Sequence, residues 1–437
     1  EEQLFEISQD TQNYLAELDR DVNIYVLDTE TRFTANSPTQ YFIQANEVIR
    51  KYSQYSSRID LEYVDMIRNP DFTSRYPGMS LAVGDILLVS GDRTRALKPQ
   101  DLFNIQSSYY GSYVSSSKAE QAMTGAVLAI TSDTVSVATV IGGHGEWDVS
   151  AFTDLLQLNA WELRTCNTMT EAIPTETDLL ILAAPERDLS PEELQEIDLF
   201  LESRTNRIFF YLGLYTQPPL KNLEAFLAEW GLAVDTGMVF ESNENLVLWN
   251  NPLLFLAEFI DSDYSRTALE QGLYPVLPQS RPMRILFEGS RYRSTQTLIQ
   301  SSISSFVRPA DADLIDWQPS ESDWRPGTPL LAMGTNNRTS VDGDIISSHV
   351  LASGSVQAFD QFLLENLNIA NSSYFLNLMD SLNKREAKFY VQDKTLGFTQ
   401  LDITTGLQIT LTLIFVILVP LVVLGTGIVV WLRRRHK

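Results

Sequence analysis

The C-terminal thirty residues constrain this chain most strongly. No charged side chain occurs between Ile403 and Leu432, and the run from Leu407 to Leu432 is almost wholly apolar. About 20 apolar residues suffice to cross a bilayer, and a lone span must be helical because lipid offers the backbone no hydrogen-bond partners. A basic tail follows at 433–437, and such tails favour the cytoplasmic side. The sequence therefore predicts a linker over 396–406, a transmembrane helix over 407–432 and a cytoplasmic tail.

Small and hydroxyl-bearing side chains interrupt the apolar run at Thr410, Thr412, Gly425 and Gly427. Residues of this kind are typical of positions where membrane helices pack closely. A lone anchor needs none of them, so the pattern favours an integral-membrane partner. Chance is the alternative explanation, because short residues are common in apolar helices.

Composition restricts the cellular compartment and the classes of binding partner that we expect for this protein. The net charge is −24, which disfavours nucleic acid, phosphate-rich polymers and anionic lipid headgroups as partners. A single cysteine, Cys166, excludes an internal disulfide. An exported protein without disulfides suits a bacterial envelope better than a eukaryotic secretory route. We therefore expect a bacterial cell-membrane protein whose bulk is extracytoplasmic.

Residues 1–131 carry the pattern of one small α/β module. Ser8 is placed to cap a first helix, and Gly91-Asp92 is typical of a hairpin turn. The other expected elements are strands over 22–27 and 59–64, a helix over 38–52, hairpin strands over 85–89 and 95–97, and a helix over 118–130. A βαβ unit, a hairpin and a helix form the order of a thioredoxin-like module. It has no Cys-x-x-Cys pair, so redox chemistry is not expected.

Residues 132–395 predict a second α/β domain, with a Rossmann-like parallel sheet covered on both faces. Ser190, Pro191 and Glu193 form a capping box that starts one of its helices. The expected strands are 135–142, 161–166, 178–183 and 207–212, with 284–287, 330–333 and 349–353 as further candidates and 388–391 as a last strand-like piece; the expected helices are 152–159, the one after Ser190, 219–231, 359–367 and 374–383. The stretch 241–330, rich in Pro, Ser and Asn, is expected to be an irregular insertion.

A glycine-rich turn after the first strand of this domain is the candidate site. It comprises Gly143, His144, Gly145 and Glu146. Parallel sheets place ligands at the carboxyl ends of their strands, where a histidine and a carboxylate could bind a ligand, hold a metal or perform acid–base work. The alternative interpretation is structural: the glycines permit a tight turn, and the two polar side chains bond to backbone.

Other chemistry has little support in the sequence. The remaining histidines are His349 and His436, so a histidine-based zinc site has few ligands to draw on. Cys166 lacks the Gly-x-nucleophile-x-Gly frame and is interpreted as a buried small hydrophobe. No P-loop motif occurs, so ATP hydrolysis by that route is excluded. We predict no catalytic residue, no metal and no cofactor.

Several segments resemble the GldG-like auxiliary proteins of ABC-2 type transporters. They are Glu120-Gln121-Ala122-Met123-Thr124-Gly125-Ala126-Val127, then Gly143-His144-Gly145-Glu146, the segment Pro185-Glu186-Arg187-Asp188-Leu189-Ser190-Pro191-Glu192-Glu193-Leu194, the opening Ser8-Gln9-Asp10-Thr11, and the closing span with Trp431. Their order covers most of the chain, with 241–345 the faintest part. One departure is Gly354-Ser355-Val356-Gln357, where relatives tend to show Gly-Asp-Ser-Asp, so no role of those carboxylates is carried over.

The resemblance implies an extracytoplasmic module held beside an ABC-2 permease and its separate ATPase subunit, with a second anchor upstream of Glu1. It also implies a thioredoxin-like domain followed by a domain similar to glutamine-amidotransferase folds, without their catalytic cysteine. The leading hypothesis is thus a non-enzymatic subunit that binds a substrate or caps the permease. The alternatives are a cell-surface hydrolase or metal-dependent enzyme that uses His144 and Glu146, and an envelope scaffold or sensor.

Overall fold

In the computed structural model, almost all described residues belong to one compact unit, Glu1–Lys394. The structure describes residues 2–108, 111–260, 263–289, 292–309, 318–339, 345–366 and 368–385, together with Val391, Lys394 and Arg435. In these ranges we find no helix with the length and apolar character needed to span a bilayer. The expected linker over 396–406, the expected span over 407–432 with Thr410, Thr412, Gly425 and Gly427, and all of the basic tail except Arg435 lie outside the described residues.

A four-stranded sheet in the order β2-β1-β3-β4 forms the first part of the fold. Its strands are β1 (Val22–Val26), β2 (Ile59–Tyr63), β3 (Ile86–Ser90) and β4 (Arg93–Leu97). β1 pairs with β2 in parallel, whereas β3 is antiparallel to both β1 and β4. Gly91 turns the β3–β4 hairpin at a φ of 59°, which glycine adopts without strain. The predicted βαβ unit and hairpin are therefore confirmed.

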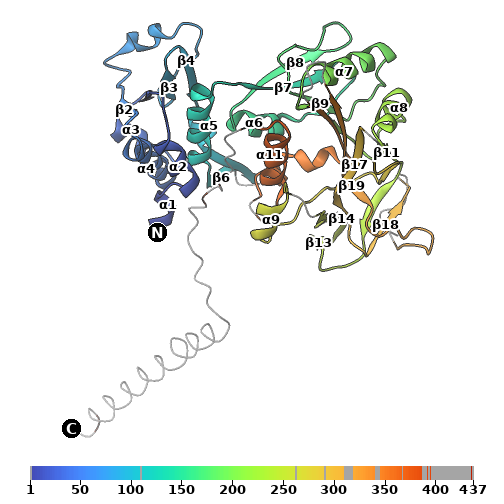
Figure 1. The fold of residues 1–437 in the computed structure, drawn as a ribbon. Helices are drawn as coiled ribbons and strands as arrows, with labels where there is room; N and C mark the ends of the chain where they lie inside the picture. Colours follow the sequence, from blue (N-terminus) through green and yellow to red (C-terminus); the bar gives the residue numbers. More distant parts are fainter. Residues whose placement is uncertain are drawn as a thin grey trace. The chain divides into compact units, whose positions relative to one another are not determined.

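Helices surround this sheet, and one of them connects it to the rest of the unit. They are α1 (Glu2–Phe5), α2 (Gln9–Ala16), α3 (Glu30–Thr34), α4 (Thr39–Tyr55), η1 (Pro70–Arg75) and α5 (Ala119–Thr131). The Ser8 side chain accepts a hydrogen bond from the Thr11 N–H, which confirms the predicted cap. Figure 1 shows α5 alongside β3 and β4. Small side chains on α5 allow this close packing, and nearly all of its residues are buried.

The sequence missed one hairpin in this region. It consists of β5 (Phe103–Ser108) and β6 (Gly111–Ser117), and a short 3-10 turn, η2 (Pro99–Leu102), precedes it. β5 and β6 are rich in serine and asparagine and show little alternation of apolar and polar residues. Without that alternation, the main sequence signal for a strand is absent.

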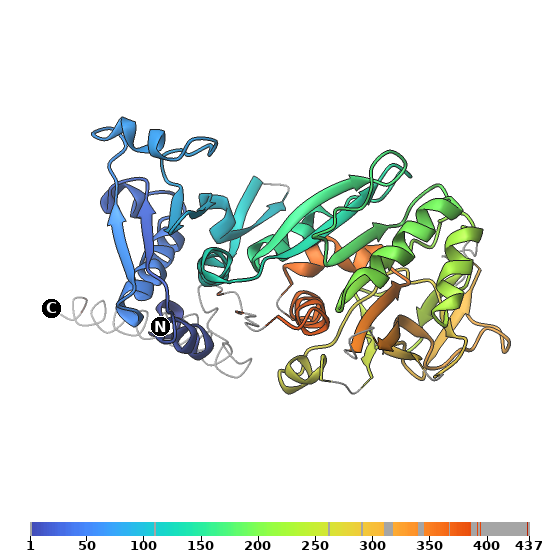
Figure 2. The ribbon, with the colours of Figure 1, turned by 45° about the horizontal axis from the view of Figure 1, so that its top comes forward.

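An eight-stranded sheet in the order β15-β17-β19-β20-β10-β9-β7-β8 dominates the rest of the unit (Figure 2). Its strands are β7 (Ser136–Gly142), β8 (Trp161–Asn167), β9 (Leu179–Ala183), β10 (Arg207–Leu212), β15 (Glu258–Phe259), β17 (Arg293–Gln300), β19 (Pro329–Thr339) and β20 (Ile345–Ser353). β7, β8, β9, β10 and β20 run parallel, whereas β15, β17 and β19 pair antiparallel. The expected parallel strands are therefore present, but the sheet as a whole is mixed, because β15, β17 and β19 add an antiparallel part. Since few residues separate β19 from β20, the connection is too short for a parallel crossover.

Helices cover both faces of this sheet, as predicted. Along β9, Leu179 and Ile181 point into one core and Leu180 and Leu182 into the other. The first core packs against α6 (Ser150–Leu158) and α11 (Asn371–Leu382), and the second against α7 (Pro191–Ser203) and α8 (Lys221–Glu229). The capping box at Ser190 is present: its side chain accepts from the Glu193 N–H, and Glu193 accepts from the Ser190 N–H.

Three expectations about the later chain were wrong. The stretch 241–330 is not simply irregular, because it supplies β15 and β17 to the large sheet. It also contains β13 (Val247–Leu248), β14 (Asn251–Phe255), α9 (Arg266–Glu270) and β18 (Ser305–Arg308). The last of these strands pairs with β12 (Met238–Glu241). The strand expected at 284–287 is β16 (Met283–Ile285), which pairs with β11 (Leu232–Val234) outside that sheet. The helix expected at 359–367 is a 3-10 turn, η3 (Val356–Phe359), followed by α10 (Gln361–Leu364). Most of the strand-like piece at 388–391 lies outside the described residues.

Candidate functional site

The predicted site lies at the point where the strand order reverses. The parallel strands follow one another along the chain as β7, β8, β9, β10 and β20, but in space they lie as β8-β7-β9-β10-β20. The direction of winding therefore changes between β7 and β9, and doubly wound sheets hold ligands at the carboxyl ends of the strands at this place. Gly143–Glu146 follows β7 directly, and Ala184 follows β9. We call residues 143–147 the switch-point loop.

His144 is enclosed by two carboxylates. Its side chain is nearly fully buried, with Nδ1 3.2 Å from Glu146 Oε1 and Nε2 3.1 Å from Glu193 Oε1. The Glu146 carboxylate also accepts the His144 backbone N–H at 2.9 Å. Both ring nitrogens of histidine donate hydrogen bonds only in the doubly protonated ring. The roles of the two ring nitrogens thus depend on the tautomer, and each of them faces a carboxylate oxygen.

Glu193 serves this site and the start of α7 at once. Its Oε1 accepts from the Thr168 hydroxyl at 2.8 Å, and its Oε2 accepts from the Ser190 N–H at 2.9 Å. Burial raises the pKa of Glu193, but hydrogen bonds from Ser190 and Thr168 and the charge of His144 outweigh burial, so the pKa lies below its ordinary value. The carboxylate of the predicted capping box is therefore also the second partner of His144.

The switch-point loop is bonded to the segment that follows β9. The His144 carbonyl accepts from the N–H groups of Glu186 and Arg187 at 3.0 and 3.1 Å, and the Trp147 N–H donates to the Ala183 carbonyl at 2.8 Å. At Gly143, with a φ of 114°, a Cβ atom would lie 2.5 Å from the Asn167 side-chain oxygen. The crevice that other folds use for a ligand is thus occupied by the protein's own groups.

Metal and nucleophile chemistry find no support at this site. Among the described residues there is no group of three or more His, Cys, Asp and Glu side chains that could hold a metal ion. Cys166, at the end of β8, is buried, and burial raises the pKa of its thiol. A buried thiol with a raised pKa is a poor nucleophile. The structural interpretation of the glycine-rich turn is therefore the one that the geometry favours.

His349 should make stability depend on pH. It lies on β20, and burial lowers its pKa from 6.5 to about 4. Because the folded state then binds the proton more weakly than the unfolded state, stability is full above pH 6.5 and falls as the pH drops toward 4. We expect His349 to account for a loss of about 2 kcal/mol between pH 7 and pH 5. Urea unfolding of the wild type and of His349→Gln at both pH values checks this, and equal losses in the two proteins would contradict it.

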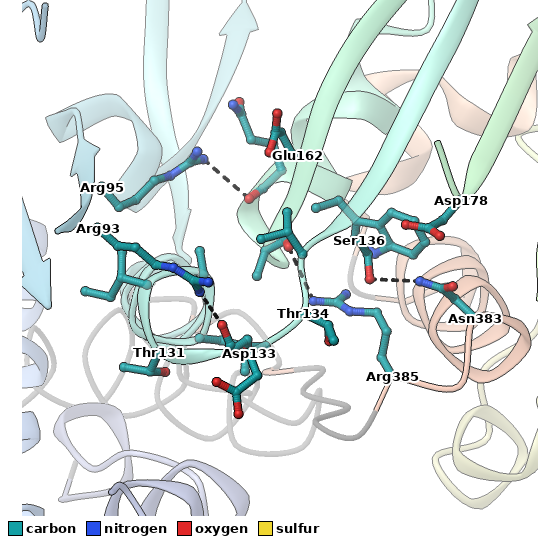
Figure 3. A pocket seen from close by; sticks show the side chains of 18 of the residues that line it. Arg93, Arg95, Thr131, Asp133, Thr134, Ser136, Glu162, Asp178, Asn383 and Arg385 are labelled. Atoms are coloured by element: carbon teal, nitrogen blue, oxygen red, sulfur yellow. Dashed lines mark hydrogen bonds between the residues drawn. The ribbon is translucent and has the colours of Figure 1, made fainter. Parts of the chain in front are cut away.

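A second recess lies at the opposite end of these strands (Figure 3). This amino-end groove has a volume of about 990 Å³ and is lined by residues from β4, the end of α5, the start of β7 and β8, and the segments 204–206 and 383–385. In Figure 3, Arg93 and Arg95 reach into it from one side and Asn383 and Arg385 from the other. The Asn383 side chain donates to Ser136 Oγ at 2.8 Å.

The charges of the amino-end groove are partly neutralised. Three of its carboxylates, Asp133, Glu162 and Asp178, form ion pairs with Arg20, Arg164 and Arg204 respectively. Arg93 and Arg95 instead donate to backbone carbonyls, those of Ser132 and Gln157. Neither arginine of β4 forms an ion pair with a carboxylate of the described residues. Both arginines are half-buried, and burial lowers the pKa of Arg95, so the groove holds two guanidinium groups that are partly withdrawn from solvent.

Sequence analysis did not identify Glu120 as a residue with a special role, but its contacts in the structure set it apart. It is buried on α5, where its Oε1 accepts from the Ser8 N–H at 2.6 Å and its Oε2 lies 3.0 Å from the Lys394 ammonium. The Lys394 N–H and carbonyl also bond to the carbonyl and N–H of Ser117, both at 2.8 Å. The sequence did contain one signal for this pair: Glu120 is the single carboxylate in a helix of small and apolar residues. A carboxylate that is buried with such a helix needs a partner, so its position indicates an ion pair.

Comparison with known proteins gives a partial match. Residues 1–105 match a family model described as "Domain of unknown function (DUF7088)". A structure titled "mmIFT52 N-terminal domain" is 14% identical and covers 57% of this chain and 99% of its own, with a TM-score of 0.43. Another, titled "Wild-type E. coli MenE with bound m phenylether-linked analogue of OSB-AMS", is 10% identical over 79% of this chain and 70% of its own, with a TM-score of 0.14. No curated protein matches. The first quarter of the chain is thus similar to a family whose function is unknown.

Proposed function

We propose that this chain is a membrane-anchored, extracytoplasmic auxiliary subunit of a bacterial ABC-2 type transporter, similar to the GldG-like proteins. It would bind a substrate or cap the permease, and the separate ATPase would supply the energy. In this proposal the first module is thioredoxin-like and the large α/β domain is similar to glutamine-amidotransferase folds. The predicted C-terminal span would anchor it.

This proposal rests on one observation: residues from the two ends of the compact unit contact one another. Lys394 pairs with Glu120, which also holds the Ser8 N–H, and the Lys394 ammonium donates to the Glu6 carbonyl. Lys394, the last described residue of the unit, therefore lies beside the first helices. In this proposal, the predicted C-terminal anchor follows in sequence the residue that closes this junction.

The switch-point loop supports a role without catalysis. Both ring nitrogens of His144 face carboxylates, and its carbonyl is bonded to the segment after β9. A general acid or base needs access to a substrate proton, which a side chain this deeply buried does not have. Two of the segments that carry the family resemblance, 120–127 and 185–194, likewise make contacts that hold parts of this fold together.

Purification from native membranes tests the proposal. The tagged full chain, extracted from its own cells in mild detergent, is expected to retain a multi-span permease and an ATPase in fixed ratio. A tagged single-span protein of unrelated function serves as the control. A chain that is recovered alone, while the control shows that extraction preserves other complexes, would contradict the proposal.

Replacing His144 separates this proposal from the enzyme alternative. We expect His144→Ala to reduce the free energy of unfolding by about 2 kcal/mol, because it removes hydrogen bonds to one buried and one half-buried carboxylate. Glu193→Gln should destabilise as well, whereas Glu192→Gln, its exposed neighbour on α7, should change stability by less than about 0.5 kcal/mol. Thermal and urea unfolding measure all three. The enzyme alternative instead requires a His144→Ala protein that melts like the wild type.

A further inference from the structure

The amino-end groove borders the free edge of the first sheet. β4 is the last strand in the order β2-β1-β3-β4, so one side of it pairs with no strand of that sheet. Arg93, Thr94 and Arg95, three successive residues of β4, line the groove. Its volume of about 990 Å³ is large enough for a ligand. A binding partner in the groove would therefore meet both the backbone and the side chains of this strand.

The hairpin determines which backbone groups of β4 face away from β3. A two-residue loop separates the register partners Ser90 and Arg93. Partners that flank such a loop exchange backbone hydrogen bonds, and bonded pairs alternate with non-bonded pairs along an antiparallel ladder. Thr94 and Ala96 belong to non-bonded pairs, so their N–H and C=O groups point to the free edge. We find no backbone hydrogen bond from either residue to another segment of the described chain.

The two arginines of β4 have no counter-ion in the described part of the chain. Arg93 and Arg95 are two residues apart in a strand and therefore lie on the same face of it, and Figure 3 shows both side chains directed into the groove. Each donates to a single backbone carbonyl. Burial lowers the pKa of Arg95, and the charge of Asp101 acts in the opposite direction. A cation that is partly withdrawn from water gains when an anion approaches it.

The other charged groups of the groove restrict where an anion can bind. Asp133, Glu162 and Asp178 are already paired with arginines outside β4. Glu17 and Asp19, from the segment after α2, also line the groove, and neither forms an ion pair with a described residue. These two carboxylates would repel an anion. An anionic partner is therefore favoured only where it lies directly against β4.

We propose that the free edge of β4 binds an extended acidic segment of another protein, which adds a strand to the sheet and places two carboxylates against Arg93 and Arg95. Backbone hydrogen bonds to Thr94 and Ala96 would supply affinity, and two charge-assisted pairs would supply specificity. Alternate residues of a strand are about 7 Å apart on one face, so acidic residues two positions apart match the two arginines. This interaction goes beyond the proposed transporter role and does not depend on it.

Three synthetic peptides separate the parts of this proposal. Acetyl-Thr-Glu-Val-Glu-Thr-amide, the alternating peptide, carries two glutamates on one face; glutamine at both positions removes the charge; acetyl-Thr-Glu-Glu-Val-Thr-amide keeps the charge but puts the glutamates on opposite faces. Isothermal titration of the purified full chain near pH 7 should show that the alternating peptide binds at least about fivefold more tightly than the other two. The proposal is overturned if the alternating peptide does not bind at millimolar concentration, or if the adjacent-glutamate peptide binds as tightly.

Substitutions then place the alternating peptide on β4. Arg93→Gln and Arg95→Gln should each weaken its binding about fivefold, as expected for a partly exposed ion pair, and should leave the uncharged peptide unaffected. Arg68→Gln is the matched control, because Arg68 is an exposed arginine of the same module. Melting curves show whether each variant is folded. Folded Arg93→Gln and Arg95→Gln proteins that bind like Arg68→Gln would refute the site.

The unpaired carboxylates of the groove give a test of opposite sign. Glu17→Gln and Asp19→Asn together remove two charges that repel the alternating peptide, so the double variant should bind it about threefold more tightly. The uncharged peptide should bind the double variant as it binds the wild type. Weaker binding of the alternating peptide would mean that these carboxylates contribute to its site, which contradicts recognition of an acidic segment by the arginines.

Thr94→Pro tests the backbone pairing. Proline here removes an N–H that the β3–β4 ladder does not use, as proline does in natural edge strands. We expect binding of the alternating peptide to fall at least about tenfold, whereas Thr94→Val, which keeps the N–H, should bind it like the wild type. A peptide N-methylated on its three central residues blocks the same pairing from the ligand, and it should not bind even if Thr94→Pro unfolds. Tight binding of the N-methylated peptide would refute an added strand.

The oligomeric state distinguishes this partner from a second copy of the chain. We expect Thr94→Pro to leave the mass of the purified full chain in solution unchanged. A wild-type dimer that becomes monomeric in folded Thr94→Pro would mean that the edge pairs with another copy, and it would overturn the proposal. Peptide titration and co-purification with a permease are separate measurements, so this proposal and the transporter role fail separately.

Discussion

Replacing Gly125 by valine should reduce the free energy of unfolding by at least about 3 kcal/mol. α5 crosses the end of α6 so closely that a Cβ atom on residue 125 would lie 1.7 Å from the Leu158 carbonyl oxygen and 2.8 Å from its carbon. Both contacts involve backbone, which cannot move aside as the end of a flexible side chain could. One helix must therefore shift, and the packing of the first module against α6 with it.

Gly142→Val is the matched control for this prediction. Gly142 ends β7, its φ is not in the left-handed region, and a Cβ atom there would meet no heavy atom within 4 Å. We expect this variant to change stability by no more than about 1 kcal/mol. Urea unfolding of both variants measures the difference. If the two substitutions cost the same, α5 and α6 do not approach as closely as described.

Replacing Lys394 by methionine should cost about 3 kcal/mol, because it leaves the Glu120 carboxylate without its cation. The Glu120 side chain is 3% exposed and that of Lys394 is 18% exposed, so water cannot easily take the place of the ammonium group. The backbone pairing of residue 394 with Ser117 should survive, since methionine keeps the main chain intact. Urea unfolding of the full chain measures the loss.

A double-mutant cycle shows whether this cost belongs to the pair. Adding Glu120→Gln to Lys394→Met removes the stranded charge and should recover part of the loss, which gives an interaction energy well above zero. The exposed pair of Arg266 and Asp263 is the control, and Arg266→Met should cost less than about 0.5 kcal/mol. Additive effects of the Glu120 and Lys394 substitutions would contradict a buried ion pair.

Much of the fold was predictable because its signals are local. Runs such as Leu179–Ala183 and Arg207–Leu212 are apolar throughout, as strands buried on both faces must be. Ser190 and Glu193 mark a helix start by hydrogen bonds within four residues. The strand expected at 330–333 is part of β19, but its antiparallel pairing and the whole of β17 could not be derived in this way, because they depend on pairing partners in other segments of the chain. Pairing between distant segments leaves no pattern within either one.

The candidate site was predictable in position but not in character. A glycine-rich turn after β7 correctly indicated the carboxyl end of the sheet. Whether His144 is available to a ligand depends on Glu193, which lies 49 positions further along the chain. The Glu120–Lys394 pair also joins residues that are remote in sequence. Contacts of this kind become visible only when the chain is folded.

The closure of the unit at Lys394 has a mechanical consequence. Tension applied to the polypeptide beyond this residue would meet first the two backbone bonds to Ser117 and the ion pair with Glu120. The Ser8 N–H, next to the first helices, donates to the same Glu120 carboxylate. A force applied at either end of the unit would therefore act on α5. A force applied at Lys394 would thus act first on the end of β6 and on α5.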